Sequence, residues 1–276
     1  MSNSNIQQEH YNKTRSKRFE VFFNNPKALL GRSMPMEYFK GHRLVVEKVR
    51  KFSSDLNDIK ILDLGCGEGS WSVYWAAEGA SVTALDISEE NINITKLAAK
   101  RNGLENIDAI VGDCTDTNLK SDSFDVIVGM AVIHHLTVEQ EKRLYPELLR
   151  LLKPGGLSIF LEPIQNSKVL DYVRTLVPIF QKHNPRPSRF SKQWKDFIDN
   201  DPHPDRPNTS MHYKELLNQY QFSKVSLHEV GILNRLDRLT FNRNIRRIIH
   251  DIDYVLQPLI PFNRKLARSI ILTMIK

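Results

Sequence analysis

Residues 61–70 read Ile-Leu-Asp-Leu-Gly-Cys-Gly-Glu-Gly-Ser, and this stretch decides the expected fold of the chain. The mostly apolar run over residues 59–64 predicts a buried strand of a parallel sheet. The glycines after it predict a tight turn into a helix over residues 70–78, which Gly79 ends. Such a unit binds anions and nucleotides, because glycine admits a ligand close to the backbone and the helix N-terminus presents N–H donors.

A carboxylate before the glycines narrows the choice of ligand. The spacing is Asp63-x-Gly65-x-Gly67-x-Gly69, whereas the dinucleotide pattern G-x-G-x-x-G needs a small residue at Ser70 and is matched only in part. The charge of Asp63 would repel a pyrophosphate but suits a ligand that carries an amine and a sulfonium. The stretch therefore favours a sulfonium methyl donor over NAD.

Two further acids follow the next predicted strands. Asp86 lies at the end of the strand expected over residues 81–87, where a carboxylate can accept hydrogen bonds from both ribose hydroxyls. Its alternative role is only to precede Ser88, a predicted helix N-cap. Asp113 follows the strand expected over residues 107–111, where it can accept from an adenine amino group or be a solvated turn residue.

Strands and helices alternate along the rest of this region. Further strands are predicted over residues 124–130 and 157–162, and Thr137 and Gln140 predict a capping box for a helix that runs to Leu152. This alternation is typical of a parallel, doubly wound sheet. Later strands are expected over residues 224–230 and 269–275. The last of these is predicted to be antiparallel and to lie between the strand over residues 157–162 and the strand over residues 224–230.

The expected fold is therefore α/β: a Rossmann-like, seven-stranded, mostly parallel sheet with helices on both faces, plus helical cap insertions. Residues 1–40 are predicted to be an N-terminal arm or lid, and residues 41–163 the ligand-binding core. Residues 164–276 would add cap insertions, the last helix and two strands to the same domain. Insertions over residues 164–210 and 231–268 are expected to cover the carboxyl edge of the sheet, which predicts a closed pocket for a small, lipophilic acceptor.

These motifs, taken in order, resemble the class I S-adenosylmethionine-dependent methyltransferases. The similarity is to the small-molecule group, which includes the type 11 and quinone-biosynthesis methyltransferases, and it covers residues 60–163. It rests on the glycine stretch, on Ala-Leu-Asp-Ile-Ser at residues 84–88, on Gly112-Asp113, on Phe-Asp-Val-Ile-Val at residues 124–128, on Val-Ile-His-His-Leu at residues 132–136 and on Leu-Leu-Lys-Pro-Gly-Gly at residues 151–156.

The resemblance implies S-adenosyl-L-methionine as cofactor and a set of residues that bind it. The glycine turn would line the methionine and ribose, Asp86 would hold the ribose, the residues after the second and third strands would frame the adenine, and the end of the fourth strand would meet the methionine. Tyr11 is predicted to fold over the donor as part of a lid; a disordered tail is the alternative. The predicted cofactor-binding residues are Asp63, Gly65, Cys66, Gly67, Asp86, Ile87, Asp113, Cys114, Gly129, Met130 and Tyr11.

Two histidines are the candidate catalytic residues. His134 and His135 follow the fourth strand, at the edge where open α/β sheets bind ligands, and either can take a proton from an acceptor near neutral pH. The alternative is catalysis by orientation alone, since holding an acceptor in line with an activated methyl group can remove about 7–11 kcal/mol of the barrier. The spacing of His183, His203 and His212 predicts no metal site, and surface positions are expected for them.

The expected reaction is in-line methyl transfer to an oxygen or nitrogen nucleophile of a small molecule. A donor-binding protein without catalytic activity, acting at a membrane or in a complex, and a nucleotide-dependent oxidoreductase are the alternatives. The net charge of +7 is not gathered in an aromatic-rich basic tract, so no nucleic-acid partner is expected. A basic, apolar stretch near residues 243–268 suggests a peripheral membrane contact, but a helix that covers the sheet is favoured. The two cysteines form no CxxC pair and no signal peptide is recognised, so a cytoplasmic location is expected.

Overall fold

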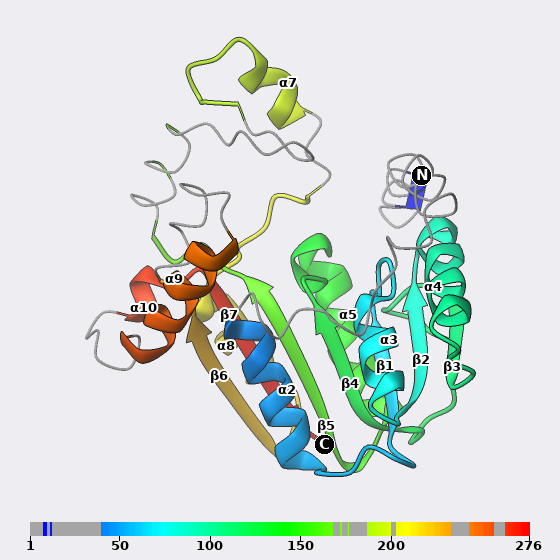
Figure 1. The fold of residues 1–276 in the computed structure, drawn as a ribbon. Helices are drawn as coiled ribbons and strands as arrows, with labels where there is room; N and C mark the ends of the chain where they lie inside the picture. Colours follow the sequence, from blue (N-terminus) through cyan, green and yellow to red (C-terminus); the bar gives the residue numbers. More distant parts are fainter. Residues whose placement is uncertain are drawn as a thin grey trace.

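A computed structural model gives the fold of the chain (Figure 1). It describes residues 8–9, 12, 40–167, 172, 176, 187–199, 203–232, 243–256 and 263–276. Most of the predicted N-terminal arm, including Tyr11, lies outside these residues. Within the described part of the chain, no helix combines the length and the apolar character needed to cross a bilayer.

In the described part of the chain, seven strands form one sheet in the order β3-β2-β1-β4-β5-β7-β6. Neighbouring strands from β3 through β5 are parallel, whereas β7 runs antiparallel to both β5 and β6. The predicted α/β class and the antiparallel last strand, placed between β5 and β6, are confirmed. The strands are β1 (Lys60–Leu64), β2 (Ser81–Asp86), β3 (Ile107–Val111), β4 (Phe124–Met130), β5 (Leu152–Pro163), β6 (Lys224–Val230) and β7 (Ser269–Ile275).

Helices cover both faces of this sheet, because successive residues of the buried strands point to opposite sides. Ile61 of β1 packs in one core with Val49 and Trp75, whereas its neighbour Leu62 packs in the other with Leu148. The first face carries α2 (Lys40–Phe52), α3 (Ser70–Ala77) and α4 (Glu89–Arg101), and the second carries α5 (Val138–Leu151) and α8 (Ser210–Leu217).

Two helices begin with the N-terminal caps that the sequence predicts. The Ser88 hydroxyl accepts a hydrogen bond of 3.3 Å from the backbone of Asn91 and so caps α4. Thr137 and Gln140 form the complete capping box of α5. These contacts satisfy N–H groups that the first turn of a helix leaves without a helical partner.

The start of β5 differs from the prediction. The strand begins at Leu152 rather than residue 157, so the expected turn over residues 153–156 lies within it. Leu152 pairs with Phe124 of β4, and the ladder shifts register between Phe124 and Val126. The Gly155 N–H donates to the carbonyl of Lys276 at 3.1 Å. Partners on both sides therefore keep these residues in the sheet despite their turn-like sequence.

The remaining helices belong to the segments after β5 and β6. In Figure 1, α7 (Gln193–Asp199) lies beyond the carboxyl ends of the strands, as the predicted cap requires. In contrast, α9 (Arg243–Leu256) contacts α2, and α10 (Asn263–Leu266) contacts β6. The second insertion thus packs against the β6 side of the sheet, and the division into arm, core and cap stays a prediction.

Candidate functional site

A pocket of about 330 Å³ opens at the carboxyl edge of the sheet, beside the neighbouring strands β1 and β4. From β1 the chain continues to β2 on one side, and from β4 it continues to β5 on the other side. That edge is the usual ligand position in open α/β sheets, and the volume falls within the range of small-molecule sites. The pocket is lined by Gly65, Gly67, Leu85, Asp86, Ile87, Asn91, Gly112, Asp113, Cys114, Met130, Ala131, Val132, His135, Leu136 and Gln140.

The glycine turn forms one wall with its backbone. Gly65 and Gly67 have φ angles of 68° and 55°, a left-handed conformation that glycine adopts without strain. A Cβ atom at Gly65 would lie 2.7 Å from a methyl group of Val132, whereas one at Gly67 would meet nothing within 4 Å. Gly65 is therefore required by packing, and Gly67 leaves open space in which a ligand can approach the chain.

Asp86 is held rigidly at the end of β2. One carboxylate oxygen accepts from the Gly67 N–H at 2.8 Å, and the other accepts from the Ser88 N–H at 2.9 Å and the Asn91 amide at 3.0 Å. The side chain lines the pocket and also braces the start of α4, so both roles considered from the sequence apply. Asn91, which sequence reasoning missed, fixes the carboxylate from the first turn of that helix.

Asp63 lies behind the glycine turn rather than on the pocket surface. Its side chain is buried and accepts a hydrogen bond of 2.6 Å from the Ser72 hydroxyl of α3. Burial, with a smaller contribution from the charge of Asp86, raises the pKa of Asp63 to about 7, although the hydrogen bond from the Ser72 hydroxyl opposes this shift. A positive ligand group near the glycine turn would favour its ionised form.

The two cysteines lie on the β2–β3 side of the site. Cys114 lines the pocket, and burial raises the pKa of its thiol, so the thiol is protonated. Cys66 is buried with its sulfur 3.8 Å from the Thr95 hydroxyl, and burial raises its pKa as well. Next to Cys114, Asp113 accepts from both the backbone and the hydroxyl of Thr115 at 2.8 Å, which makes it both a turn residue and part of the wall.

Of the two predicted residues at the end of β4, Met130 lines the pocket and Gly129 does not. A Cβ atom at Gly129 would lie 2.3 Å from the ring of Phe160, so packing in the sheet explains this glycine. The next residue, Ala131, has a φ of 58°, which is uncommon for a residue with a side chain. This conformation turns the chain from β4 into the 3₁₀ helix η4 (Ile133–His135), which forms the opposite wall.

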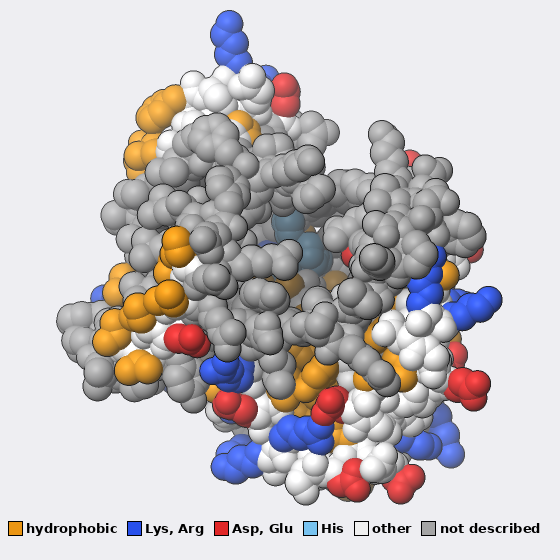
Figure 2. Space-filling view, viewed as in Figure 1, with side chains coloured by type: hydrophobic (Ala, Val, Ile, Leu, Met, Phe, Trp, Pro, Cys, Tyr) orange, Lys and Arg blue, Asp and Glu red, His pale blue; other side chains and the backbone are white. Residues whose placement is uncertain are grey.

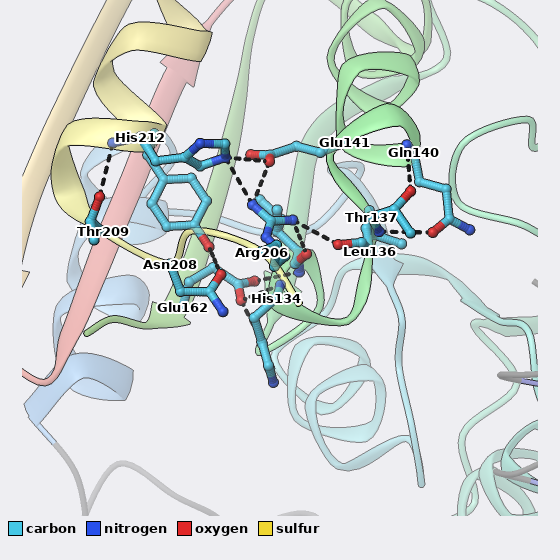
Figure 3. Close-up of polar contacts among 12 residues, drawn as sticks. His134, Leu136, Thr137, Gln140, Glu141, Glu162, Arg206, Asn208, Thr209 and His212 are labelled. Atoms are coloured by element: carbon cyan, nitrogen blue, oxygen red, sulfur yellow. Dashed lines mark hydrogen bonds and ion pairs between the residues drawn. The ribbon is translucent and has the colours of Figure 1, made fainter. Parts of the chain in front are cut away.

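A buried acid at the end of β5 holds η4 in place (Figure 3). Glu162 accepts hydrogen bonds from the backbone N–H groups of Val132, Ile133 and His134 at 2.8, 2.9 and 3.2 Å. Its second oxygen also lies 2.9 Å from Nδ1 of the His134 ring. Sequence reasoning missed Glu162, although an acid inside an apolar strand that ends at the ligand edge is the signal that could have found it.

Arg206 also binds the backbone in and beside η4, through carbonyl groups rather than N–H groups. Its fully buried guanidinium donates to the carbonyls of Ile133 and Leu136 at 2.8 and 2.9 Å and forms an ion pair with Glu141 of α5. His212 joins this pair, with Nε2 2.8 Å from the carboxylate of Glu141 (Figure 3). His212 is therefore mostly buried, and the prediction of a surface position for it is wrong. Arg206 lies in a proline-rich segment without a periodic pattern, so the sequence held no signal for it.

The structure brings most predicted site residues together. Four of them do not line the pocket but lie behind its wall, beside the glycine turn or η4: Asp63, Cys66, Gly129 and His134. Of the predicted lid, Gln8 donates to the carbonyl of Ile87 at 2.9 Å, and Asn12 accepts from the Ser88 hydroxyl at 2.7 Å. The residues that do line the pocket are Gly65, Gly67, Asp86, Ile87, Asp113, Cys114, Met130 and His135.

Comparison with known proteins agrees with this arrangement. Residues 61–156 match the model of a methyltransferase domain family. The ubiquinone biosynthesis O-methyltransferase of Rickettsia canadensis is 34% identical over 116 residues, which cover 42% of this chain and 47% of that protein. The demethylmenaquinone methyltransferase of Lactococcus lactis is 29% identical over 189 residues, which cover 62% of this chain and 73% of that protein.

A solved structure shows the same fold. The phosphoethanolamine N-methyltransferase 2 of Haemonchus contortus, in complex with phosphomonomethylethanolamine and S-adenosylhomocysteine, superposes with a TM-score of 0.57 at 15% identity. The match covers 85% of this chain and 52% of that one.

The strand order, the glycine turn and these matches resemble those of class I methyltransferase domains. The match of residues 61–156 to a methyltransferase-domain model supports the resemblance predicted from the motifs. The chain spans about half the length of the curated ubiquinone-biosynthesis relatives that it matches.

Proposed function

We propose that the protein transfers a methyl group from S-adenosylmethionine to a nucleophile of a small, quinone-type metabolite. The observation that carries this proposal is the placement of Asp86. Its carboxylate lines the pocket directly beside the open space at Gly67, and three donors fix its orientation. A carboxylate held in this way suits the two hydroxyls of a ribose.

The other walls also fit the donor. Leu85, Ile87 and Cys114 give apolar contacts for a flat base, and Asp113 adds an acceptor for its amino group. On the opposite side, the buried Asp63 lies near the glycine turn, where the methionine part would lie, and the positive charge of the donor would favour its ionised form. The bound donor would supply a methyl group already activated on a sulfonium.

The protein's own part is then to hold the acceptor and exclude water. Met130, Val132 and Leu136 form an apolar wall next to the donor region, and Glu162 and Arg206 fix the loop that carries two of them. A rigid wall of this kind favours catalysis by orientation. The apolar wall and the quinone-pathway names of the two relatives support an aromatic, lipophilic acceptor. The choice between an oxygen and a nitrogen nucleophile stays a prediction.

Calorimetric titration of the full chain with S-adenosylhomocysteine, and separately with NADH, tests the donor. We expect one equivalent of S-adenosylhomocysteine to bind and NADH not to bind; tight binding of NADH alone would refute the proposal. A labelled-methyl assay with hydroxylated quinols and with small amines then tests the acceptor. Label that enters only amines would contradict the quinone-type class and leave the donor proposal standing.

A further inference from the structure

Three histidine side chains meet beside the pocket. His134 and His135 come from η4, and His203 comes from the segment between β5 and α8. The ring centroids lie 4.0 Å apart for His134 and His135, 4.5 Å for His135 and His203, and 5.2 Å for His134 and His203. One ring nitrogen from each residue lies within 4.8 Å of the others. Figure 2 shows histidine side chains in a hollow near the centre of one face of the molecule.

The His134 ring is oriented as metal-binding histidines usually are. Its Nδ1 lies 2.9 Å from the buried carboxylate of Glu162, and the other ring nitrogen points away from that acid (Figure 3). An ionised carboxylate only accepts hydrogen bonds, so the proton lies on Nδ1 and the Nε2 lone pair faces outward. A carboxylate that fixes the ring and tautomer of a histidine in this manner is the common outer partner at zinc sites.

We propose that His134, His135 and His203 bind one divalent transition-metal ion of the zinc class. Three imidazoles and no carboxylate in the ligand group suit zinc or a similar metal rather than magnesium or calcium. Zn–N bonds of about 2.0–2.1 Å in a tetrahedral site place the ligand nitrogens roughly 3.4 Å apart. The three ligand nitrogens lie within 4.8 Å of one another, so metal binding would require the rings to rotate and bring these nitrogens closer together.

The metal would connect two parts of the chain that are distant in sequence. His203 lies three residues before Arg206, which donates hydrogen bonds to the carbonyl groups of Ile133 and Leu136. A bound ion would add a second link between this segment and the pocket wall, with its fourth position taken by water. A ring nitrogen that binds a metal cannot also act as a general base, so this proposal replaces the predicted base roles of His134 and His135.

Zinc titration of the untagged, chelator-treated full chain tests the site, with calorimetry for affinity and Co²⁺ absorption in the visible range for geometry. We expect one equivalent of Zn²⁺ in the unmodified protein, a tetrahedral Co²⁺ spectrum and a higher Tm with Zn²⁺. His203→Ala should weaken Zn²⁺ binding by at least about 100-fold and abolish the rise in Tm. His228→Ala changes an exposed histidine of β6 and should leave both unchanged.

Equal zinc affinity in the unmodified protein and His203→Ala would overturn the proposal, as would the lack of any binding in the former. Circular dichroism and the Tm in chelator show whether His203→Ala is folded. If it is not, His203→Gln keeps a side chain of similar length and takes its place, with the same expected loss of zinc.

Discussion

Asp86 shows how one residue can organise a binding site. Its two oxygens accept from Gly67 before it and from Ser88 and Asn91 after it, so the carboxylate ties the glycine turn to the start of α4. A group that is already oriented loses little freedom when a ligand binds. Under the proposed function, the same oxygens would face the donor.

Asp86→Asn should therefore weaken the binding of S-adenosylhomocysteine by about 10–100-fold, since a hydrogen bond to a charged group contributes about 1.5–3 kcal/mol. Calorimetry measures this change, and Asp108→Asn on the exposed side of β3 is the matched control. Unchanged affinity in Asp86→Asn would mean that the ribose does not lie at this carboxylate.

Asp63 makes the stability of the protein depend on pH. Burial raises its pKa from 3.8 to about 7, so between these values the folded chain binds more protons than the unfolded chain. Stability must then fall as the pH rises through this window, by up to about 1.4 kcal/mol for each pH unit.

Asp63→Asn should remove this contribution. Urea unfolding at pH 5 and pH 8 should show a smaller loss of stability in Asp63→Asn than in the unmodified protein. Asp108→Asn again serves as control and should keep the full loss. An identical pH dependence in all three proteins would show that Asp63 titrates in its ordinary range.

At the scale of elements, η4 is a short helix of three residues, and side chains from other elements fix the position of its backbone. Glu162 from β5 binds its N–H groups, and Arg206 binds carbonyl groups at Ile133 and Leu136. The backbone N–H and carbonyl groups of this pocket wall thus form hydrogen bonds with two buried side chains of opposite charge.

Arg206→Met should destabilise the protein by about 3–5 kcal/mol, because Glu141 would keep a buried charge without its arginine. Adding Glu141→Gln should recover part of this loss, since the second change removes that charge. Denaturant unfolding of the two single variants and the double variant measures the coupling energy. Strict additivity would argue that the ion pair contributes nothing of its own.

For the whole molecule, β6 is joined to the sheet through β7. Opening of β7 therefore releases β6, whereas β6 can open alone. Native-state hydrogen exchange should show that amides of β6, such as Leu227, are never better protected than those of β7, such as Leu272. Higher protection in β6 would mean that its contacts with α8 and α10 hold it independently of β7.

The sequence predicts those parts of the molecule that depend on local pattern. Strand and helix alternation gave the sheet, Ser88 and Thr137 gave helix starts, and the glycine spacing gave the ligand edge. The early start of β5 was not predicted, because its pairing with Phe124 outweighs the turn-like residues over 153–156.

The loop supports could not be predicted for a different physical reason. Arg206 contacts Ile133 and Leu136 across about 70 residues of chain, and it lies in a proline-rich segment that has no helical or strand period. The meeting of His203 with His134 depends on the same long connection. Such contacts are set by tertiary packing, and no spacing in the sequence encodes them.

The place of β7 also bears on the order in which the chain can fold during synthesis. The ribosome makes β6 before β7, yet in the finished sheet β7 lies between β5 and β6. A nascent chain that has just released β6 can pair strands β1 to β5 but has no strand through which to attach β6. The edge of β5 and the apolar side of β6 must wait until the following segment leaves the ribosome, which makes this interval the one in which the chain most needs protection from wrong pairing.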